Sequence, residues 1–147
     1  MPIAINGSGT ITGISVGGIP DGVVDTDVLA ANAVTFGKIG TTEQGQLCKA
    51  WVNFNGTGVV AIRASYNVSS ITDNGTGDYT VNFTTAMVDA NYSVLGTCNV
   101  NIAGNNSRVL SAPNAQAPTT SSVRVGTTLS SAGGVEDQLY VYVAIFR

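Results

Sequence analysis

Apolar and polar residues alternate along most of the chain after residue 46. The segment KAWVNFN (residues 49–55) places Ala50, Val52 and Phe54 on one face of an extended strand. This period of two is typical of a β-strand with one buried face. Comparable alternation places Val60, Ile62, Ala64, Tyr66 and Val68 on one face of GVVAIRASYNV (58–68). It likewise places Tyr79, Val81 and Phe83 on one face of YTVNFTT (79–85), and it occurs in YSVLGTCNVNI (92–102) and SSVRVGTTL (121–129). The pattern predicts about six antiparallel strands in this part of the chain.

Short glycine-rich segments separate the predicted strands. NGTG (55–58) and DNGTGD (73–78) have the Asn-Gly chemistry of tight hairpin turns. Strands joined in this way favour an all-β fold, which we expect to be a jelly-roll-like antiparallel sandwich of two sheets over residues 47–147. Helix is expected only as a turn around 87–90.

The closing segment QLYVYVAIFR (138–147) is apolar on both faces. One face consists of Leu139, Val141, Val143 and Ile145, and the second face consists of the residues that alternate with them. A strand of a monomeric sandwich normally has one solvated face, so the second face is covered either by the chain's own loops or by another subunit. We favour the interpretation that another subunit covers the second face. The predicted head-domain interface is Trp51, Tyr140, Tyr142 and Phe146.

Residues 1–46 have a different pattern, in which glycines interrupt short β-branched pieces. GVVDTDVLAA (22–31) aligns with NAVTFGKIGT (32–41) at a spacing of ten residues. Such pieces are too short to bury a face alone, so the segment is either a disordered tail or an extended arm that becomes ordered against other chains. The regular recurrence favours the arm. The arm residues predicted to contact other copies or an anchoring protein are Val24, Leu29, Val34 and Ile39.

Composition and charge narrow the function classes. Charged residues make up 10% of the chain, against about 25% in an ordinary soluble domain. The net charge is −3 and the six basic residues are scattered, so a nucleic-acid partner is not expected. No apolar run reaches the length of a membrane span, and the N-terminus lacks the pattern of a secretory signal. Cys48 and Cys98 are expected to be free thiols in a protein made in a reducing cytosol, rather than a disulfide.

Candidate catalytic chemistry is sparse. The chain has no histidine, which removes Ser-His and Cys-His nucleophiles and most catalytic metal sites. Glu136 and Asp137 are the nearest approach to paired carboxylates within the predicted sandwich. DNGTGD (73–78) is rich in oxygen ligands, but no glutamate follows at the calcium-loop distance, so a hairpin turn is favoured. We expect no catalytic residues, no cofactor and no metal.

Two longer segments resemble a known group of proteins. They are GTITGISVGGIPDGVVDTDVLAANAV (9–34) and AWVNFNGTGVVAIRASYNVSSITDNGTGDYTVNFTTAM (50–87), and the pattern AV-x-x-x-K-I is met by Ala33, Val34, Lys38 and Ile39. These segments resemble tail fibre and related appendage proteins of tailed bacteriophages. The resemblance implies a glycine-rich N-terminal arm in which three chains wind together, followed by a β-rich head. Only two ten-residue repeats are present, which implies a short fibre, spike or knob.

The expectation is therefore a noncatalytic virion structural protein, made in the cytoplasm of the bacterial host and assembled as a homotrimer. Its arm would anchor it to other tail or capsid proteins, and its head would project outward, with a host surface glycan as a further candidate partner. Two alternatives stay open. One is a capsid decoration (cement) or head-fibre protein that clamps capsomers. The other, from a different class, is a glycan-cleaving hydrolase.

Overall fold

The computed structural model describes residues 29, 31, 33–99, 108–112, 116–129 and 134–147. Contacts divide the chain into two units, Met1–Gly40 and Thr41–Arg147. In the described part of the first unit, a single 3₁₀ turn, η1 (Phe36–Lys38), is held by Lys38, whose Nζ donates to the carbonyl oxygen of Ala33 at 2.6 Å. The predicted residue Val24 lies outside the described residues.

The second unit begins with a short helix and continues as strands. The helix α1 (Thr41–Gly45) carries Glu43 in its first turn, where a carboxylate favours helix formation. Because η1 and α1 are helical turns, the prediction of an extended conformation up to residue 46 was wrong for these residues. The helical turn predicted at 87–90 is also absent there, since Met87–Ala90 form bends and irregular chain in which Asp89 Oδ1 accepts from the amide of Asn91 at 2.8 Å.

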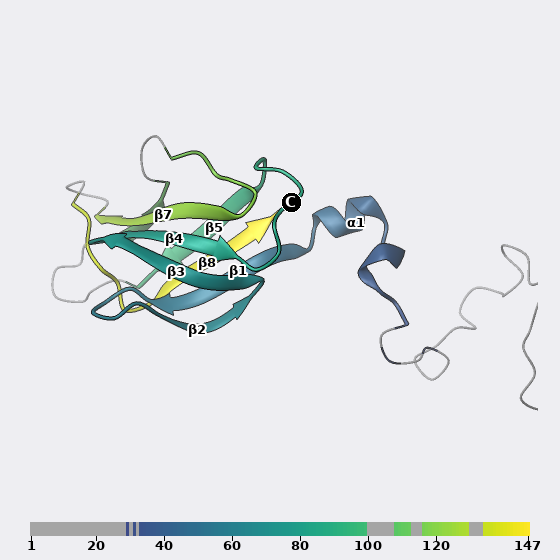
Figure 1. Cartoon of the computed structure of the whole chain (residues 1–147), viewed down its shortest axis with the longest axis horizontal. Helices are drawn as coiled ribbons and strands as arrows, with labels where there is room; N and C mark the ends of the chain where they lie inside the picture. The colour runs from purple at the N-terminus through teal and green to yellow at the C-terminus, as the bar shows by residue number, and fades with distance from the viewer. Residues whose placement is uncertain (1–28, 30, 32, 100–107, 113–115, 130–133) are drawn as a thin grey trace, which may run out of the picture. The chain divides into compact units, whose positions relative to one another are not determined.

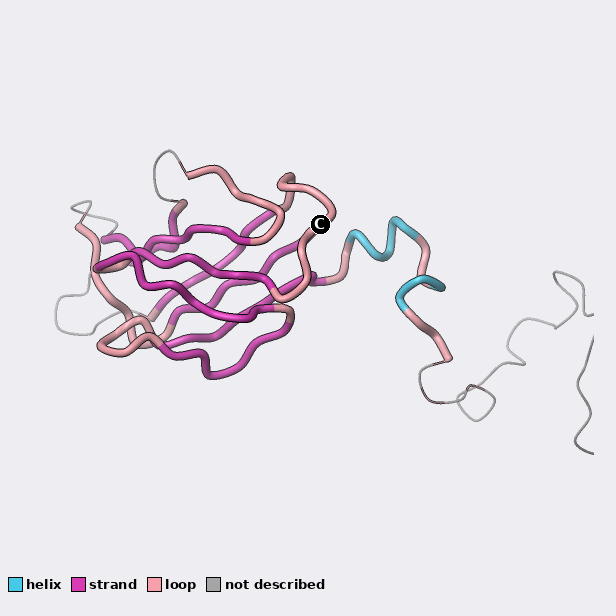
Figure 2. The backbone as a smooth tube through the Cα atoms, viewed as in Figure 1, coloured by secondary structure: helices cyan, strands magenta, loops and turns pink. Residues whose placement is uncertain are grey.

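The described residues of the second unit form eight strands (Figures 1 and 2). The strands are β1 (Cys48–Asn55), β2 (Ala61–Tyr66), β3 (Val68–Gly75), β4 (Asp78–Phe83), β5 (Ser93–Cys98), β6 (Arg108–Ser111), β7 (Ser122–Leu129) and β8 (Val141–Phe146). One sheet, here called sheet A, has the order β2-β1-β8-β5, and the other, sheet B, has the order β3-β4-β7-β6. Every strand pair is antiparallel. The prediction of an all-β antiparallel sandwich is confirmed.

Two strands were not predicted as such. The segment 58–68, expected as one strand, is divided by Asn67, which has φ 54° and separates β2 in sheet A from β3 in sheet B. Asparagine tolerates this conformation better than most residues, and here its side chain donates to the carbonyl oxygens of Lys49 and Thr85, both at 3.1 Å. Strand β6 was missed because its four residues, RVLS, are too few to display a period.

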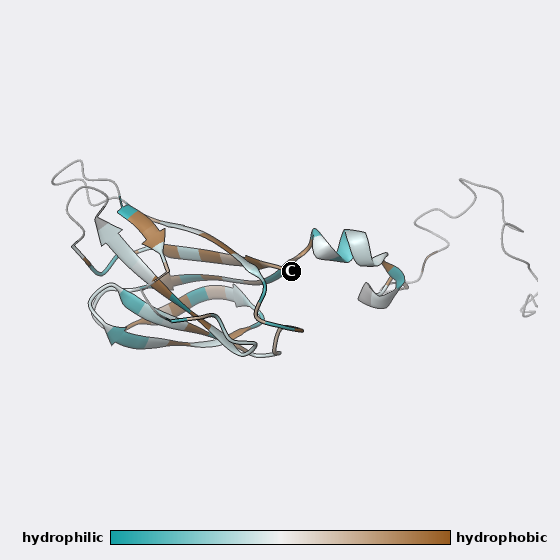
Figure 3. Cartoon of the chain, turned by 90° about the horizontal axis from the view of Figure 1, so that it is seen from above, coloured by the Kyte–Doolittle hydropathy of each residue, from teal (hydrophilic) through white to brown (hydrophobic). Residues whose placement is uncertain are grey.

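The core lies between the two sheets and is built from the inward positions of the alternating pattern (Figure 3). The predicted faces of 49–55 and 79–85 are confirmed, since Ala50, Phe54 and Tyr79 are fully buried. Phe54 and Tyr79 meet edge to face with 5.1 Å between ring centroids, which joins sheet A to sheet B. Buried residues that complete the core are Val52, Val68, Val81, Phe83, Met87, Tyr92, Cys98, Val123, Val125, Val141, Val143 and Ile145.

The two cysteines lie at opposite ends of sheet A. Cys48 pairs with Phe146 at one end of β8, and Cys98 pairs with Val141 at the other. Five residues of strand correspond to about 17 Å, whereas bridged cysteines have Cα atoms about 4.4 to 6.8 Å apart. A disulfide within one chain is therefore excluded by the fold, and both thiols are free.

Candidate functional site: the outer face of sheet A

The aromatic residues predicted at a subunit interface lie on strands β1 and β8 of sheet A or directly before β8. Trp51 on β1 and Tyr142 on β8 alternate with core residues, so their side chains lie on the outer face, where they are 41% and 40% exposed. Tyr140, just before β8, is 39% exposed, and Phe146 is half-buried. Leu139, expected in the core, is exposed, because β8 begins only at Val141 and the chain is not yet extended at Leu139.

The strand register joins outward side chains into a row that crosses the whole sheet. Trp51 is the partner of Tyr66 on β2 and of Ala144 on β8. Ala144 is in turn the partner of Leu95 on β5. Tyr66 and Leu95, at the two ends of the row, are 59% and 55% exposed. We call Tyr66, Trp51, Ala144 and Leu95 the cross-strand row.

The sequence pattern placed Tyr66 on the wrong face. It had been grouped with Ile62 and Ala64 on one side of an unbroken strand. The register between β1 and β2 shifts at Asn53/Phe54, so that Ile62 pairs with Phe54 and Ala64 pairs with Asn53. One extra residue, Arg63, therefore reverses the alternation, and Tyr66 faces outward. Leu95 was missed for a different reason, since a single leucine gives no sign of its strand neighbours.

Arg63 is part of a stack beside the row. Its guanidinium carbon lies 4.3 Å from the centroid of the Tyr140 ring, a cation–π distance. Tyr140 in turn stacks on Tyr142, with 6.3 Å between centroids and 5° between ring planes. Tyr140 therefore has Arg63 over its ring and the parallel ring of Tyr142 beside it.

The outer face of sheet B is polar. The side-chain nitrogen Nδ2 of Asn82 on β4 donates to Ser70 Oγ at 3.1 Å and to Thr72 Oγ1 at 2.9 Å, both on β3. On the neighbouring strands, Arg124 Nε donates to Asp78 Oδ1 at 2.7 Å. These partners satisfy one another across the strands, as is typical of a solvated sheet face. The sandwich thus has one polar and one aromatic outer face.

The carboxylates of the sandwich have structural partners. Asp78 pairs with Arg124, Asp89 with Arg147, and Glu136 with Arg108. Asp137 accepts from the Tyr79 hydroxyl, and Asp73 accepts from the amide of Gly75 at 2.9 Å. The last contact closes the DNGTGD turn, where Gly75 and Gly77 have positive φ, as the hairpin interpretation requires. Within the described ranges no three acidic or cysteine side chains are grouped as metal ligands.

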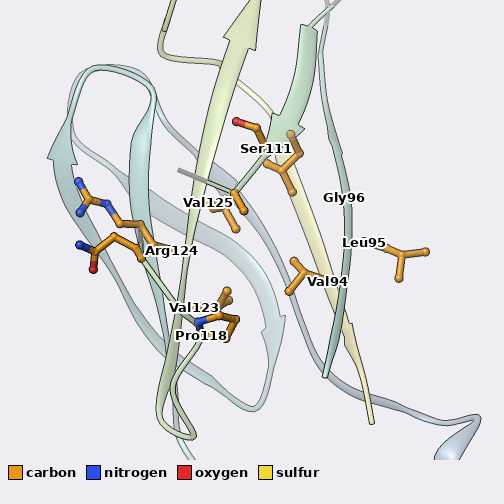
Figure 4. Close-up of a pocket in the computed structure, with 11 residues that line it drawn as sticks. Val94, Leu95, Gly96, Ser111, Pro118, Val123, Arg124 and Val125 are labelled. Atoms are coloured by element: carbon orange, nitrogen blue, oxygen red, sulfur yellow. The ribbon is translucent and has the colours of Figure 1, made fainter. Parts of the chain in front are cut away.

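A cleft of about 410 Å³ opens between β5 and the β6–β7 side of sheet B. Val94, Val123 and Val125 point into it, whereas Leu95 points away, toward the outer face (Figure 4). Its polar lining includes Ser111, Gln116 and Arg124, and the last is already paired with Asp78. The lining residues contain no carboxylate or thiol.

The predicted contact residues of the arm are a second candidate site. Leu29 is 44% exposed and Val34 is 59% exposed, while Ile39 is half-buried. Two of the apolar side chains in the ten-residue pattern therefore remain open to solvent in a single chain. The structure contains one chain, so their contacts with other chains stay a prediction.

Comparison of the chain with protein-family models, with curated proteins and with solved structures gave no match. Among the described residues, no helix has the length and apolar character that crossing a membrane requires.

Proposed function

We propose that this protein is a noncatalytic structural component of a tailed-bacteriophage virion, a short homotrimeric appendage. The observation that carries the proposal is the exposure of Leu29 and Val34 in an N-terminal unit that is separate from a sandwich with its own complete core. Exposed apolar side chains at a regular spacing suit a segment that binds other chains. The proposal also rests on the resemblance of residues 9–34 and 50–87 to phage appendage proteins.

The carboxylates support the noncatalytic part of the proposal. A glycan hydrolase needs two carboxyl groups facing a substrate cleft, about 5 to 10 Å apart. In the sandwich, Asp78, Asp89 and Glu136 are paired with arginines, and Asp137 is bound to Tyr79. These contacts hold the carboxylates to the fold. An assay of the purified protein for release of reducing sugar from host polysaccharide is expected to give none, and release would support the hydrolase alternative.

The test of virion assembly is direct. Particles of the phage that encodes the chain would be purified by density gradient and labelled with an antibody raised against the protein. We expect labelled particles, with the label at the tail for a fibre or spike and over the capsid for a decoration or head-fibre protein. Particles that carry no label, when lysate from the same infection contains the protein, would overturn the proposed function.

A further inference from the structure

We propose that the outer face of sheet A is the surface on which a second copy of this chain docks. This inference rests on the proposed homotrimer and names the surface through which the sandwich takes part in it. The cross-strand row of Tyr66, Trp51, Ala144 and Leu95 is its centre. In a closed trimer the three copies of a surface residue meet only where they lie close to the threefold axis, so the proposal places the row at that axis.

The size and flatness of the face suit another folded chain. The row spans three interstrand gaps, about 14 Å, and strands of six residues extend it by about 20 Å in the other direction. Trp51, Leu95 and Tyr142 are each at least 40% exposed on it. These two lengths give an area of about 280 Å², close to the largest apolar patch of a typical monomer, about 300 to 600 Å², which is often functional. A standard interface buries about 800 Å² per partner, so we expect the arm to add to what this face contributes.

The charge of the face suits an identical copy. The charged residues of the four strands of sheet A are Lys49 and Arg63, and neither belongs to the row. Lys49 Nζ donates to the carbonyl oxygen of Gln44 at 2.5 Å, and Arg63 lies over Tyr140. Copies can therefore meet at the row around a threefold axis without placing like charges against each other, which would oppose association.

A polar group beside the row is a further reason to propose that another chain docks on this face. Asn53 Oδ1 is buried, and no donor within the described residues reaches it. Asn53 is the register partner of Tyr142, so it lies directly beside the row. An unmet buried acceptor is costly, and a donor supplied by another chain would satisfy it.

A sugar fits this face less well than a second copy. Sugars stack on open aromatic faces, whereas Tyr140 has Arg63 on its ring and Tyr142 beside it. Sugar sites also use carboxylates to bind hydroxyl groups, and the described strands of sheet A carry none.

The experiment compares three full-length variants with the original protein by light scattering over a range of concentrations. Leu95→Glu and Trp51→Glu place a charge in the row. Val109→Glu is the matched control, because Val109 is 44% exposed on β6, the edge strand of sheet B that corresponds to β5 in sheet A. We expect the two row variants to raise the dissociation constant of the oligomer by at least about 100-fold, since each would bury an unpaired carboxylate. The control should keep the mass of the original protein.

Circular dichroism and thermal melting identify any variant that fails to fold, and Leu95→Ser and Trp51→Ser then take its place. The proposal would be overturned if the row variants had the same mass in solution as the original protein. It would also be overturned if the original protein were a single chain at all concentrations. In that second case, binding of host oligosaccharides that is lost in the row variants would assign the face to a sugar. If only the docking proposal is wrong, purified particles still carry the antibody label. If the proposed function is wrong, the particles carry no label.

Discussion

Tyr79 donates a hydrogen bond to Asp137, with 2.7 Å between the phenolic oxygen and Oδ1, although 58 residues separate them in sequence. The same Oδ1 accepts from the amide of Gly77 at 2.7 Å, and the Tyr79 hydroxyl lies 3.0 Å from the carbonyl oxygen of Gly56. Burial, together with the hydrogen bond to Asp137, raises the pKa of Tyr79 well above its usual value. The Tyr79 hydroxyl and the Asp137 carboxylate together thus join the turns that follow β1 and β3 to the segment before β8.

Tyr79→Phe removes this hydroxyl and leaves the ring in place. We expect a loss of about 1 to 3 kcal/mol in the free energy of unfolding, because the buried carbonyl and carboxylate lose a donor. Urea unfolding followed by fluorescence measures the change. Thr84→Val is the control, since Thr84 is exposed outside the cross-strand row and a surface hydroxyl is worth within about 0.5 kcal/mol. Equal losses in the two variants would contradict a role for the buried network.

Two aspartates predict a loss of stability in acid. The hydrogen bond from Arg124 lowers the pKa of Asp78, and that from Arg147 lowers the pKa of Asp89 to about 2. A lowered folded-state pKa stabilises the fold above the unfolded value of 3.8, and this stabilisation is lost as pH falls toward 2. We expect the Tm to be steady from pH 7 to 5 and to fall between pH 4 and 2.

Asp78→Asn removes one of these titrations. Its Tm should be lower than that of the original protein at pH 7 and should decrease less between pH 4 and 2, because the asparagine does not lose a charge. Thermal melts at half-unit pH steps measure both effects. Parallel curves for the two proteins would show that the pairing of Asp78 with Arg124 does not contribute to the acid response.

Gly96 is required by the close approach of the two sheets. A Cβ at this position would overlap the Leu110 side chain and lie 2.5 Å from the carbonyl oxygen of Tyr142. We expect Gly96→Ala to destabilise the sandwich by about 1 to 3 kcal/mol, as overpacking does elsewhere. Gly45→Ala is the control, because nothing lies within 4 Å of its added Cβ. Chemical denaturation compares the two, and a Gly96→Ala protein as stable as the control would contradict the close packing of β5 against β6.

The arm is tested by the pair Val34→Asp and Ile39→Asp in one full-length chain. If these side chains are buried between chains, each contributes roughly 1.5 to 3 kcal/mol to assembly, and the charged pair should abolish either the oligomer or the incorporation into particles. Light scattering and quantification of the protein in purified particles measure the two outcomes. Thr42→Asp is the control, since Thr42 is exposed and close in sequence. Normal mass together with normal incorporation would show that the ten-residue pattern is not an interface.

The sequence by itself determined the class of fold and most of its inward faces. Val52, Tyr79 and Val81 are buried because alternation on a strand sends every second side chain to the core. The Asn-Gly chemistry of residues 73–78 likewise marked the β3–β4 hairpin, since few residues adopt the backbone that Gly75 and Gly77 have there. These are local properties, and a local pattern is enough to predict them.

The tertiary structure alone decided which strands are neighbours and therefore what the outer faces contain. Tyr66 faces outward only because an extra residue at Arg63 reverses the alternation, and Asn67 moves the chain to the other sheet. Leu95 joins Trp51 only through Ala144, on a strand about 50 residues after Leu95. Pairing between distant strands depends on how two whole sheets pack, and no short stretch of sequence records it. The cross-strand row is for that reason a property of the fold.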